Sequence, residues 1–362
     1  MFKKLLCLFF LFVSVLSFSQ NSTLSENSKV SIFTCGRGNE LYTTFGHTAI
    51  RIKDEATNLD VVYNYGAFDF NTDNFYLKFV KGDLQYFINA TSYEGFIYEY
   101  QIEKREVIEQ TLNFSLPQKQ ELFELLNTSL FSEERSYTYK FIDRNCTTMV
   151  VEKINKMLEK NLIQKIDDKT ITYRELLYPY FENHFYYKLG INIIFGAKTD
   201  AKAEKLFLPS ELMHSLNKAQ INGKPVLTKT ETIVVGEELE SGFSFLNSIY
   251  FIALLLLILV IANNKKVFIT YLFLTGILGL FLSLVGLYSL HKEVLWNYNA
   301  LLFNPLFLIL PFLRGKALKI TLLLCIGCIV IYVILMFTKP HLWLMSPFIL
   351  ATLYMFWKTQ RE

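Results

Sequence analysis

The pattern of apolar and polar positions divides the 362-residue chain into three parts. Lys3 and Lys4 precede a mostly apolar run at 5–18, and residues 17–19 have the small-x-small pattern of a cleavage site. This predicts a secretory signal peptide over residues 1–19, with an uncleaved signal anchor as the alternative. Residues 20–222 have the mixed composition of a soluble globular domain, and from residue 245 onward the chain is strongly apolar again.

Alternating apolar residues and turn-forming clusters predict an α+β fold for the soluble part. A cluster at 54–58 separates two apolar runs and predicts a hairpin between them. Helical spacing of leucines after Pro117 predicts a helix at 116–130. The expected strands are 29–33, 48–53, 61–65, 85–90 and 97–101, and the further expected helices are 74–80, 146–158, 172–183 and 210–219. Residues 223–244 are expected to be an extended or irregular linker.

Five apolar runs follow the linker, and each approaches the length that crosses a bilayer. They cover 245–262, 267–290, 298–313, 320–337 and 342–357, and the third is short and contains Pro305 and Pro311. Lys and Arg are most frequent after the first run, after the third run and at the C-terminus, which predicts that these segments are cytoplasmic. The expected domain at 245–362 therefore has about five spans, a cytoplasmic C-terminus and the soluble domain on the opposite side.

The net charge of +3 is too small to indicate binding to nucleic acid. Cys325 and Cys328 form a C-x-x-C inside the fourth apolar run, where small packing residues are expected and a metal site is not. We expect neither a metal nor a cofactor. Cys35 and Cys146 are the cysteines of the exported part, and they could form a disulfide, or Cys146 could be a free reactive thiol.

His47 and Cys146 are the residue types of a thiol nucleophile and its base. Cys146 is expected at a helix N-terminus, with Asn145 as the N-cap, where the helix dipole favours a thiolate. His47 on a nearby strand would accept the thiol proton, and the backbone N–H of Cys146 would stabilise an oxyanion. The alternative is a buried apolar Cys146 and a structural His47.

Further site residues depend on the pairing of the predicted strands. If Ala49 pairs with Asn64, then Asn64 shares a sheet face with His47 and is the expected third catalytic residue; a one-residue slip would place Tyr65 there. Arg51 would lie on the face of His47 and could hold a phosphate. Residues expected near substrate at the outer membrane surface, or alternatively as interfacial anchors, are His291 and Asn297.

A histidine strand that precedes an Asn-Cys helix start is similar to the circularly permuted NlpC/P60 papain-like fold of lecithin:retinol acyltransferase-like enzymes. Four motifs in order then resemble the Lnb family of membrane-anchored periplasmic proteins. They are Phe45-Gly46-His47-Thr48-Ala49-Ile50-Arg51, Tyr63-Asn64-Tyr65-Gly66-Ala67-Phe68-Asp69-Phe70, Arg144-Asn145-Cys146 and Phe207-Leu208-Pro209.

The resemblance implies a periplasmic acyltransferase domain at 20–222 in a bacterial inner membrane. It also implies the reaction, in which an acyl chain moves from a membrane phospholipid, through a Cys146 thioester, to the free α-amine of a diacylglyceryl lipoprotein. Tyr65 and Asn145 are then expected with Arg51 in substrate binding. A membrane-anchored papain-like hydrolase of peptides or thioesters, and a scaffold without activity, are the alternatives.

Overall fold

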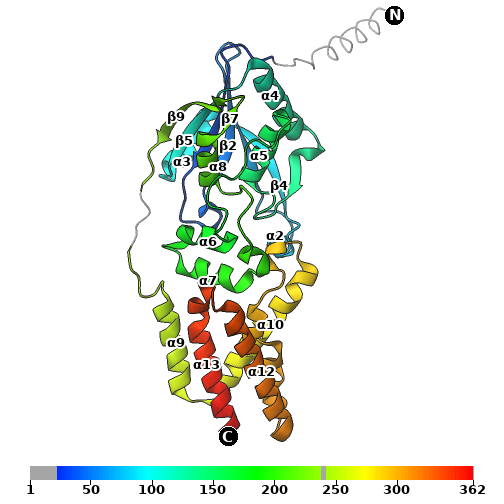
Figure 1. The fold of residues 1–362 in the computed structure, drawn as a ribbon, viewed down its shortest axis with the longest axis vertical. Coiled ribbons are helices and arrows are strands. Elements are labelled where there is room, and N and C mark those ends of the chain that lie inside the picture. Colours follow the sequence, from blue (N-terminus) through cyan, green and yellow to red (C-terminus); the bar gives the residue numbers. More distant parts are fainter. Residues whose placement is uncertain (1–22, 238–241, 362) are drawn as a thin grey trace, which may run out of the picture.

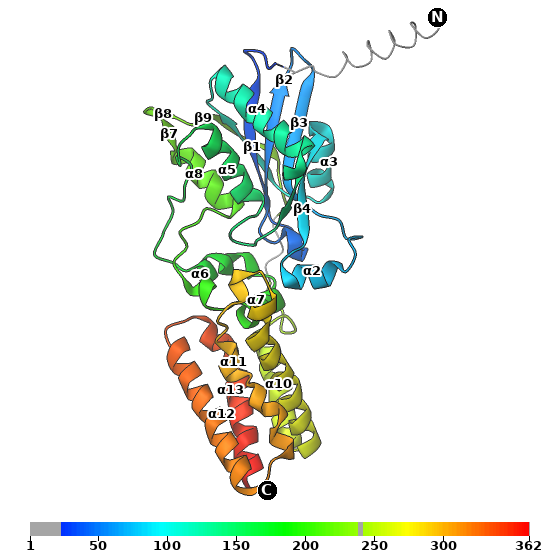
Figure 2. The same cartoon turned by 90° about the vertical axis from the view of Figure 1, so that its right-hand side faces the viewer.

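The computed structural model describes residues 23–237 and 242–361, which form a sheet-rich N-terminal part and a helical C-terminal part (Figure 1). Two views at right angles show the two parts stacked end to end along the long axis of the molecule (Figure 2). The expected signal peptide at 1–19 lies outside the described residues.

A seven-stranded sheet in the order β6-β4-β3-β2-β1-β5-β9 forms the centre of the N-terminal part, and every neighbouring pair is antiparallel. Ala49 pairs with Asn64, which is the first of the two registers considered from the sequence. The strands are β1 (Lys29–Cys35), β2 (His47–Asp54), β3 (Leu59–Ala67), β4 (Gln85–Ser92), β5 (Val107–Leu112), β6 (Ser136–Thr138) and β9 (Leu227–Val234). A short hairpin of β7 (Gln220–Ile221) and β8 (Lys224–Pro225) lies apart from it.

Helices cover both faces of the sheet, because apolar side chains alternate in direction along its central strands. One face carries Ile50 and Tyr63 and packs against three helices. The other face carries Ala49 and Val62 and packs against a single helix. The first three are α4 (Leu116–Phe131), α5 (Cys146–Met157) and α8 (Pro209–Lys218), and the single helix is α3 (Tyr93–Ile102).

One expectation for the N-terminal part was wrong, and two strands were not predicted as such. Residues 97–101 belong to helix α3, which begins at the N-cap Ser92 and buries Phe96, Ile97 and Tyr100 at helical spacing. Strand β5 was not expected. Strand β9 lies inside the expected linker at 223–244 and pairs with β5 at the edge of the sheet. The expected short helix is confirmed as α2 (Phe75–Lys81).

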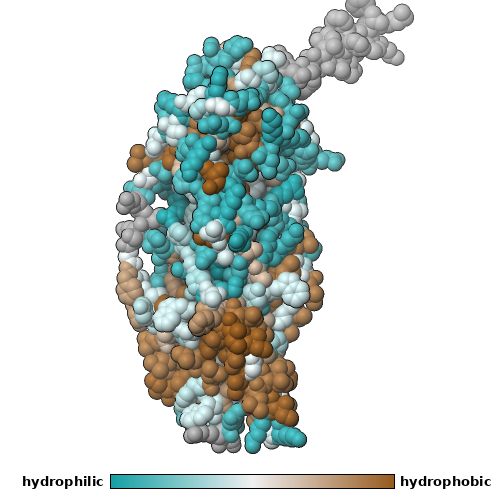
Figure 3. All heavy atoms as spheres, in the orientation of Figure 1, coloured by the Kyte–Doolittle hydropathy of each residue, from teal (hydrophilic) through white to brown (hydrophobic). Residues whose placement is uncertain are grey.

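Two helices of the described C-terminal part, α10 (Lys265–Tyr288) and α12 (Gly315–Met336), are long and apolar enough to cross a membrane. Of the other three expected spans, α9 (Ile249–Ala262) is shorter, and α13 (His341–Arg361) contains Pro347. The remaining run is divided into α11 (Asn299–Leu302), η6 (Pro305–Leu308) and η7 (Leu310–Phe312). The prolines explain the breaks, since each lacks an N–H for the helix. Hydrophobic residues cover most of the visible surface of this part, and more hydrophilic residues lie at its lower end (Figure 3).

A buried polar junction joins the two parts. Arg174 in α6 (Tyr173–Leu177) is 1% exposed and donates to Asp200 Oδ1 at 2.8 Å and Asn192 Oδ1 at 3.0 Å. Asn192 belongs to α7 (Phe185–Ile194), whose last carbonyls accept hydrogen bonds from Asn297 and Asn299. These contacts fix the position of the N-terminal part relative to the apolar helices.

Candidate functional site

Helix α5 begins at Cys146 because Asn145 caps it. The Asn145 side-chain oxygen accepts from the N–H of Thr148 at 3.0 Å, which confirms the expected N-cap. Its amide nitrogen donates to the carbonyls of Phe141 and Phe207, both at 2.9 Å. Cys146 is therefore held as the first helical residue, where backbone N–H groups have no partner within the helix.

The start of α5 lies where strands β2 and β3 separate, a place that we call the fork. The pairing of these two strands ends at Ala49 and Asn64, and β3 then bulges around Gly66. A Cβ atom added to Gly66 would lie 3.6 Å from the Cβ of Cys146, and the φ of Gly66 is +98°. The Thr48 N–H, which has left the β2–β3 ladder, donates to the Cys146 sulfur. Opening of the sheet at this point thus makes room for the thiol.

His47 is placed at the start of β2 by a glycine. Gly46 has a φ of +77°, and a Cβ atom there would lie 2.4 Å from the carbonyl oxygen of Cys35. Only glycine fits such a position without movement of the backbone. The turn sets His47 opposite Cys35 in the β1–β2 ladder and next to the fork that holds Cys146.

The side chains of Cys146, His47 and Asn64 form one connected group. His47 Nε2 donates to Asn64 Oδ1 at 3.2 Å. The imidazole also interacts with the Cys146 thiol, both as a charge and as a hydrogen-bonding partner. An Asn64 oxygen that holds the proton of Nε2 leaves the second ring nitrogen free to accept a proton. This is the order of contacts that a thiol nucleophile, a base and an orienting residue require.

Electrostatics favour the ion pair. Burial opposes the thiolate, but the charge and hydrogen bond of His47, with the Thr48 N–H and the Thr147 hydroxyl, lower the pKa of Cys146 below its ordinary value. Burial also opposes the imidazolium, yet Cys146 and Asn64 raise the pKa of His47. By contrast, burial raises the pKa of Cys35 to about 12. Both cysteines are free thiols, so the disulfide alternative is not realised in this structure.

Tyr137 on β6 is a neighbour of this group that the sequence analysis missed. Its side chain is buried, and its hydroxyl has no hydrogen-bond partner in the described part of the chain. The hydroxyl oxygen lies 4.0 Å from the position that a Gly66 Cβ would take, and the Cys146 Cβ lies 3.6 Å from it. A buried O–H without a partner costs free energy, and its place beside Cys146 makes Tyr137 a further candidate for the site.

Residues 17–178 match the family model of the Lnb N-terminal periplasmic domain. The chain contains an Lnb periplasmic domain. The match includes both His47 and Cys146 and confirms the Lnb-type family recognised from the motifs. No curated protein and no solved structure matches the chain.

Two residues expected to bind substrate are buried inside the Lnb domain instead. Arg51 forms a two-point ion pair with Asp60 at 2.7 Å, a second pair with Glu109 at 3.1 Å, and stacks 3.5 Å from the centre of the Tyr93 ring. Its guanidinium thus has no free edge for a phosphate. Tyr65 is 0% exposed and packs in the core beneath α4 and α5.

The three other expected binding residues are also used within the protein. The side-chain oxygen of Asn145 accepts the N-cap hydrogen bond, and its side-chain nitrogen donates to two carbonyls, as described above. Asn297 donates to the carbonyls of Ile193 and Ile194 at 2.8 and 2.7 Å. His291 Nε2 donates to the carbonyl of Phe79 at 2.9 Å. These contacts give the three side chains structural roles in the protein, and their expected roles in substrate binding stay a prediction.

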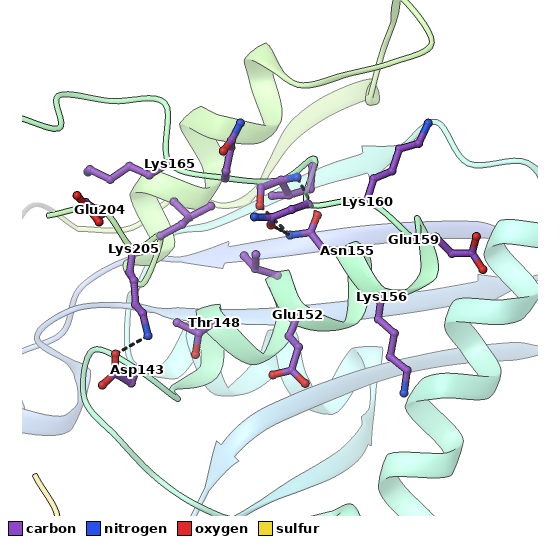
Figure 4. Close-up of a pocket in the computed structure, with 15 residues that line it drawn as sticks. Asp143, Thr148, Glu152, Asn155, Lys156, Glu159, Lys160, Lys165, Glu204 and Lys205 are labelled. Carbon is purple, nitrogen blue, oxygen red and sulfur yellow. Dashed lines mark hydrogen bonds and ion pairs between the residues drawn. The ribbon is translucent and has the colours of Figure 1, made fainter. Parts of the chain in front are cut away.

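A separate polar cavity of about 700 Å³ lies beside α5. It is lined along α5 by Thr148, Glu152 and Asn155, and Lys205 enters it from the other side to pair with Asp143 (Figure 4). Neither Cys146 nor His47 lines it. Within the described residues, no cluster of three or more His, Cys, Asp or Glu side chains could hold a metal ion.

Proposed function

We propose that the protein is a phospholipid:lipoprotein N-acyltransferase. One observation supports this most directly: an activated Cys146 thiol in contact with His47, inside an Lnb periplasmic domain that is attached to apolar helices. The substrates of this reaction are both lipids, and the helices would hold the domain at the membrane surface where both reside. We also propose that Cys146, His47 and Asn64 are the catalytic residues.

In the first half-reaction, the Cys146 thiolate attacks the ester carbonyl of a phospholipid. The C–O bond to the glycerol breaks, an acyl thioester forms, and the His47 imidazolium gives its proton to the departing alkoxide. The products are acyl-Cys146 and a lysophospholipid. Donors for the oxyanion would be the Cys146 N–H, at the open end of the helix, and the Tyr137 hydroxyl.

In the second half-reaction, the N-terminal amine of a diacylglyceryl lipoprotein attacks the thioester. An amide bond forms, the C–S bond breaks, and His47 takes the amine proton and returns one to the departing thiolate. Each cycle therefore restores the thiol and consumes one phospholipid acyl chain. Since the ester is converted to a thioester without other reactants, no nucleotide is required.

The chain order supports two further parts of the proposal. His47 precedes Cys146 in sequence, as in the circularly permuted NlpC/P60 papain-like arrangement. The basic loops and the periplasmic description of the domain support a bacterial inner-membrane location with a cytoplasmic C-terminus. A fluorescent protein fused after Glu362 should mature in the cytoplasm, and a periplasmic location of the fusion would refute this topology.

The deciding experiment expresses wild type, Cys146→Ala and a His214→Ala control in a bacterium that lacks its own lipoprotein N-acylation. Mass spectra of lipoprotein N-termini should show one added acyl chain with wild type and the control, and none with Cys146→Ala. No added chain with wild type would contradict the transferase. Activity retained by Cys146→Ala would contradict the thiol mechanism.

An in-vitro arm separates transfer from hydrolysis. The full chain in vesicles that contain a radiolabelled phospholipid should acquire label at Cys146 and pass it to an added diacylated lipopeptide. Release of label only as free fatty acid, despite the lipopeptide, would instead identify a hydrolase.

A further inference from the structure

Helix α2 and the segments beside it present an exposed apolar surface, which we call the apolar shelf. Tyr76 is 77% exposed and Leu77 is 64% exposed, and no residue of α2 is buried. Such a concentration of large apolar side chains on one surface indicates an interaction site. The shelf comprises Leu41, Tyr42, Phe70, Tyr76, Leu77, Phe79 and Val80.

The shelf is fastened to the outer end of the candidate membrane helix α10. The last carbonyls of α2 accept hydrogen bonds from the residues that directly follow α10: Ser289 Oγ donates to Val80 at 2.8 Å, and the Leu290 N–H donates to Lys81 at 2.6 Å. The His291 ring adds the bond to α2 described above. Both views place α2 directly above this end of α10 (Figure 1 and Figure 2).

The approach of these segments requires glycine at the end of α2. Gly82 has a φ of +74°, and a Cβ atom there would lie 2.8 Å from the His291 ring. The Lys140 amine also donates to the Gly82 carbonyl at 2.7 Å. These contacts hold the shelf next to the outer end of the apolar helix α10.

The shelf also borders the catalytic group on two sides. Leu41 and Tyr42 come shortly before Gly46 and His47 in the chain, and Phe70 follows the bulge that touches Cys146. Aromatic contacts connect the two sides: the Tyr42 ring centre lies 6.2 Å from that of Phe68, and Phe68 lies 4.9 Å from Phe70. An apolar surface therefore extends from the end of α10 toward the thiol.

We propose that the apolar shelf is immersed in the outer leaflet of the bilayer and guides the acyl chain of the donor phospholipid to Cys146. A lipid partner fits because the shelf continues the exposed apolar flank of α10, where Leu284 is 49% exposed and Leu287 is 87% exposed. Lys78 on the same helix suits a lipid phosphate, whereas Lys81 is ion-paired with Asp83. The guiding role rests on the proposed acyl transfer, whereas the immersion does not.

A photo-crosslinking experiment tests the immersion on its own. The full chain, with Cys146→Ala to prevent turnover, carries benzoylphenylalanine in place of Leu77 and is reconstituted in vesicles of phosphatidylethanolamine and phosphatidylglycerol. Tyr98, which is 65% exposed on α3 and farther from the helical part, gives the matched control position. After irradiation, mass spectrometry should find phospholipid adducts at position 77 at least fivefold above those at position 98.

Equal lipid adducts at the two positions, or adducts at position 77 only with protein, would overturn the shelf as a membrane surface. The guiding role has a separate test in otherwise wild-type chains. Leu77→Ser should raise the KM for the donor phospholipid about tenfold and leave the alkylation rate of Cys146 by iodoacetamide unchanged, whereas Tyr98→Ser should change neither. An unchanged KM in Leu77→Ser would overturn the guiding role. If neither Leu77→Ser nor Tyr98→Ser transfers acyl groups although the lipid adducts form at position 77, the proposed function fails. The immersion of the shelf then still stands.

Discussion

Replacement of His47 by alanine tests the electrostatics of the site most directly. The pKa of Cys146 is lowered against the opposing effect of burial, and His47 is the largest of the lowering influences. Without the imidazole, only the Thr48 N–H and the Thr147 hydroxyl remain to oppose the rise in the Cys146 pKa that burial causes. We therefore expect the pKa of Cys146 in His47→Ala to rise.

The size of the rise follows from Coulomb's law. Unit charges about 4 Å apart attract by about 1 kcal/mol in water and about 4 kcal/mol at an effective dielectric constant near 20. One pKa unit corresponds to about 1.36 kcal/mol, so the expected rise is roughly one to three units. Cys146 and His47 are both half-buried, which favours the upper part of this range. At neutral pH, each unit lowers the thiolate fraction about tenfold.

The assay is the rate of alkylation by iodoacetamide as a function of pH, with the Cys146 peptide quantified by mass spectrometry. Cys35 is an internal reference, since burial and its raised pKa should keep it unreactive until the chain unfolds. His214→Ala, which removes a half-exposed histidine on α8, should behave as wild type. An unchanged midpoint for Cys146 in His47→Ala would refute the ion pair and, with it, the assignment of His47 as the base.

Four further substitutions probe the parts that support the site. Asn64→Ala should slow acylation of the thiol about two- to tenfold in a stopped assay, because one orienting hydrogen bond is worth about 0.5–1.5 kcal/mol; an unchanged rate would remove it from the group. Tyr137→Phe should lower the acylation rate about a hundredfold without changing Tm, as loss of one oxyanion donor does elsewhere; equal rates would exclude the hydroxyl. Gly46→Ala should lower Tm by several degrees, since a left-handed φ costs about 1–2 kcal/mol before the carbonyl clash is counted; wild-type Tm would contradict the strained turn. Arg174→Ala leaves the buried Asp200 with Lys339, 3.5 Å away, as its remaining ion-pair partner and should cost about 3–5 kcal/mol in urea unfolding, against which a loss below 1 kcal/mol would argue.

The core of the sheet could be predicted because its strands obey simple rules. In β2 and β3, residues alternate between two faces, and the turn at 54–58 permits few registers. The pairing of Ala49 with Asn64 followed from these two facts. Strand β9 escaped prediction because it is an edge strand with mostly exposed residues, and its threonines and charges show no apolar face. Its pairing with β5 depends on tertiary contact alone.

Helix α3 shows the opposite failure. Its aromatic and β-branched residues are typical of strands, and they predicted a strand at 97–101. The structure instead uses the spacing of Phe96, Ile97 and Tyr100, which places all three on one side of a helix against the sheet. In a chain with 21 Tyr and 33 Phe, aromatic content carries little information about strand or helix.

That Cys146, His47 and Asn64 lie together was predictable, whereas the internal partners of the residues expected to bind substrate were not. Cys146, His47 and Asn64 were inferred from a helix start and a strand register, which are local. Arg51 was inferred from its place on the sheet face of His47, and His291 from its place at the end of an apolar run. Neither position reveals whether a partner lies inside the protein. The carboxylates of Asp60 and Glu109 and the α2 carbonyls are such partners. Asp60 lies across the hairpin from Arg51, whereas Glu109 and the α2 carbonyls come from segments distant in sequence.

The parting of β2 and β3 explains why the pKa of one thiol of the Lnb domain is lowered and that of the other is raised. Cys35 is continuous with the ladder, directly opposite His47 in register, and its burial among apolar groups raises its pKa to about 12. Cys146 reaches the same histidine from outside the ladder, through a gap that Gly66 keeps open, and there it meets a strand N–H and the open end of a helix. Both thiols share one neighbourhood, so proximity to a histidine cannot by itself activate a cysteine. A lowered thiol pKa also requires hydrogen-bond donors such as the Thr48 N–H, which are available only where β2 and β3 separate. If β2 and β3 stayed paired at this point, we expect the pKa of Cys146 to rise even with His47 in place.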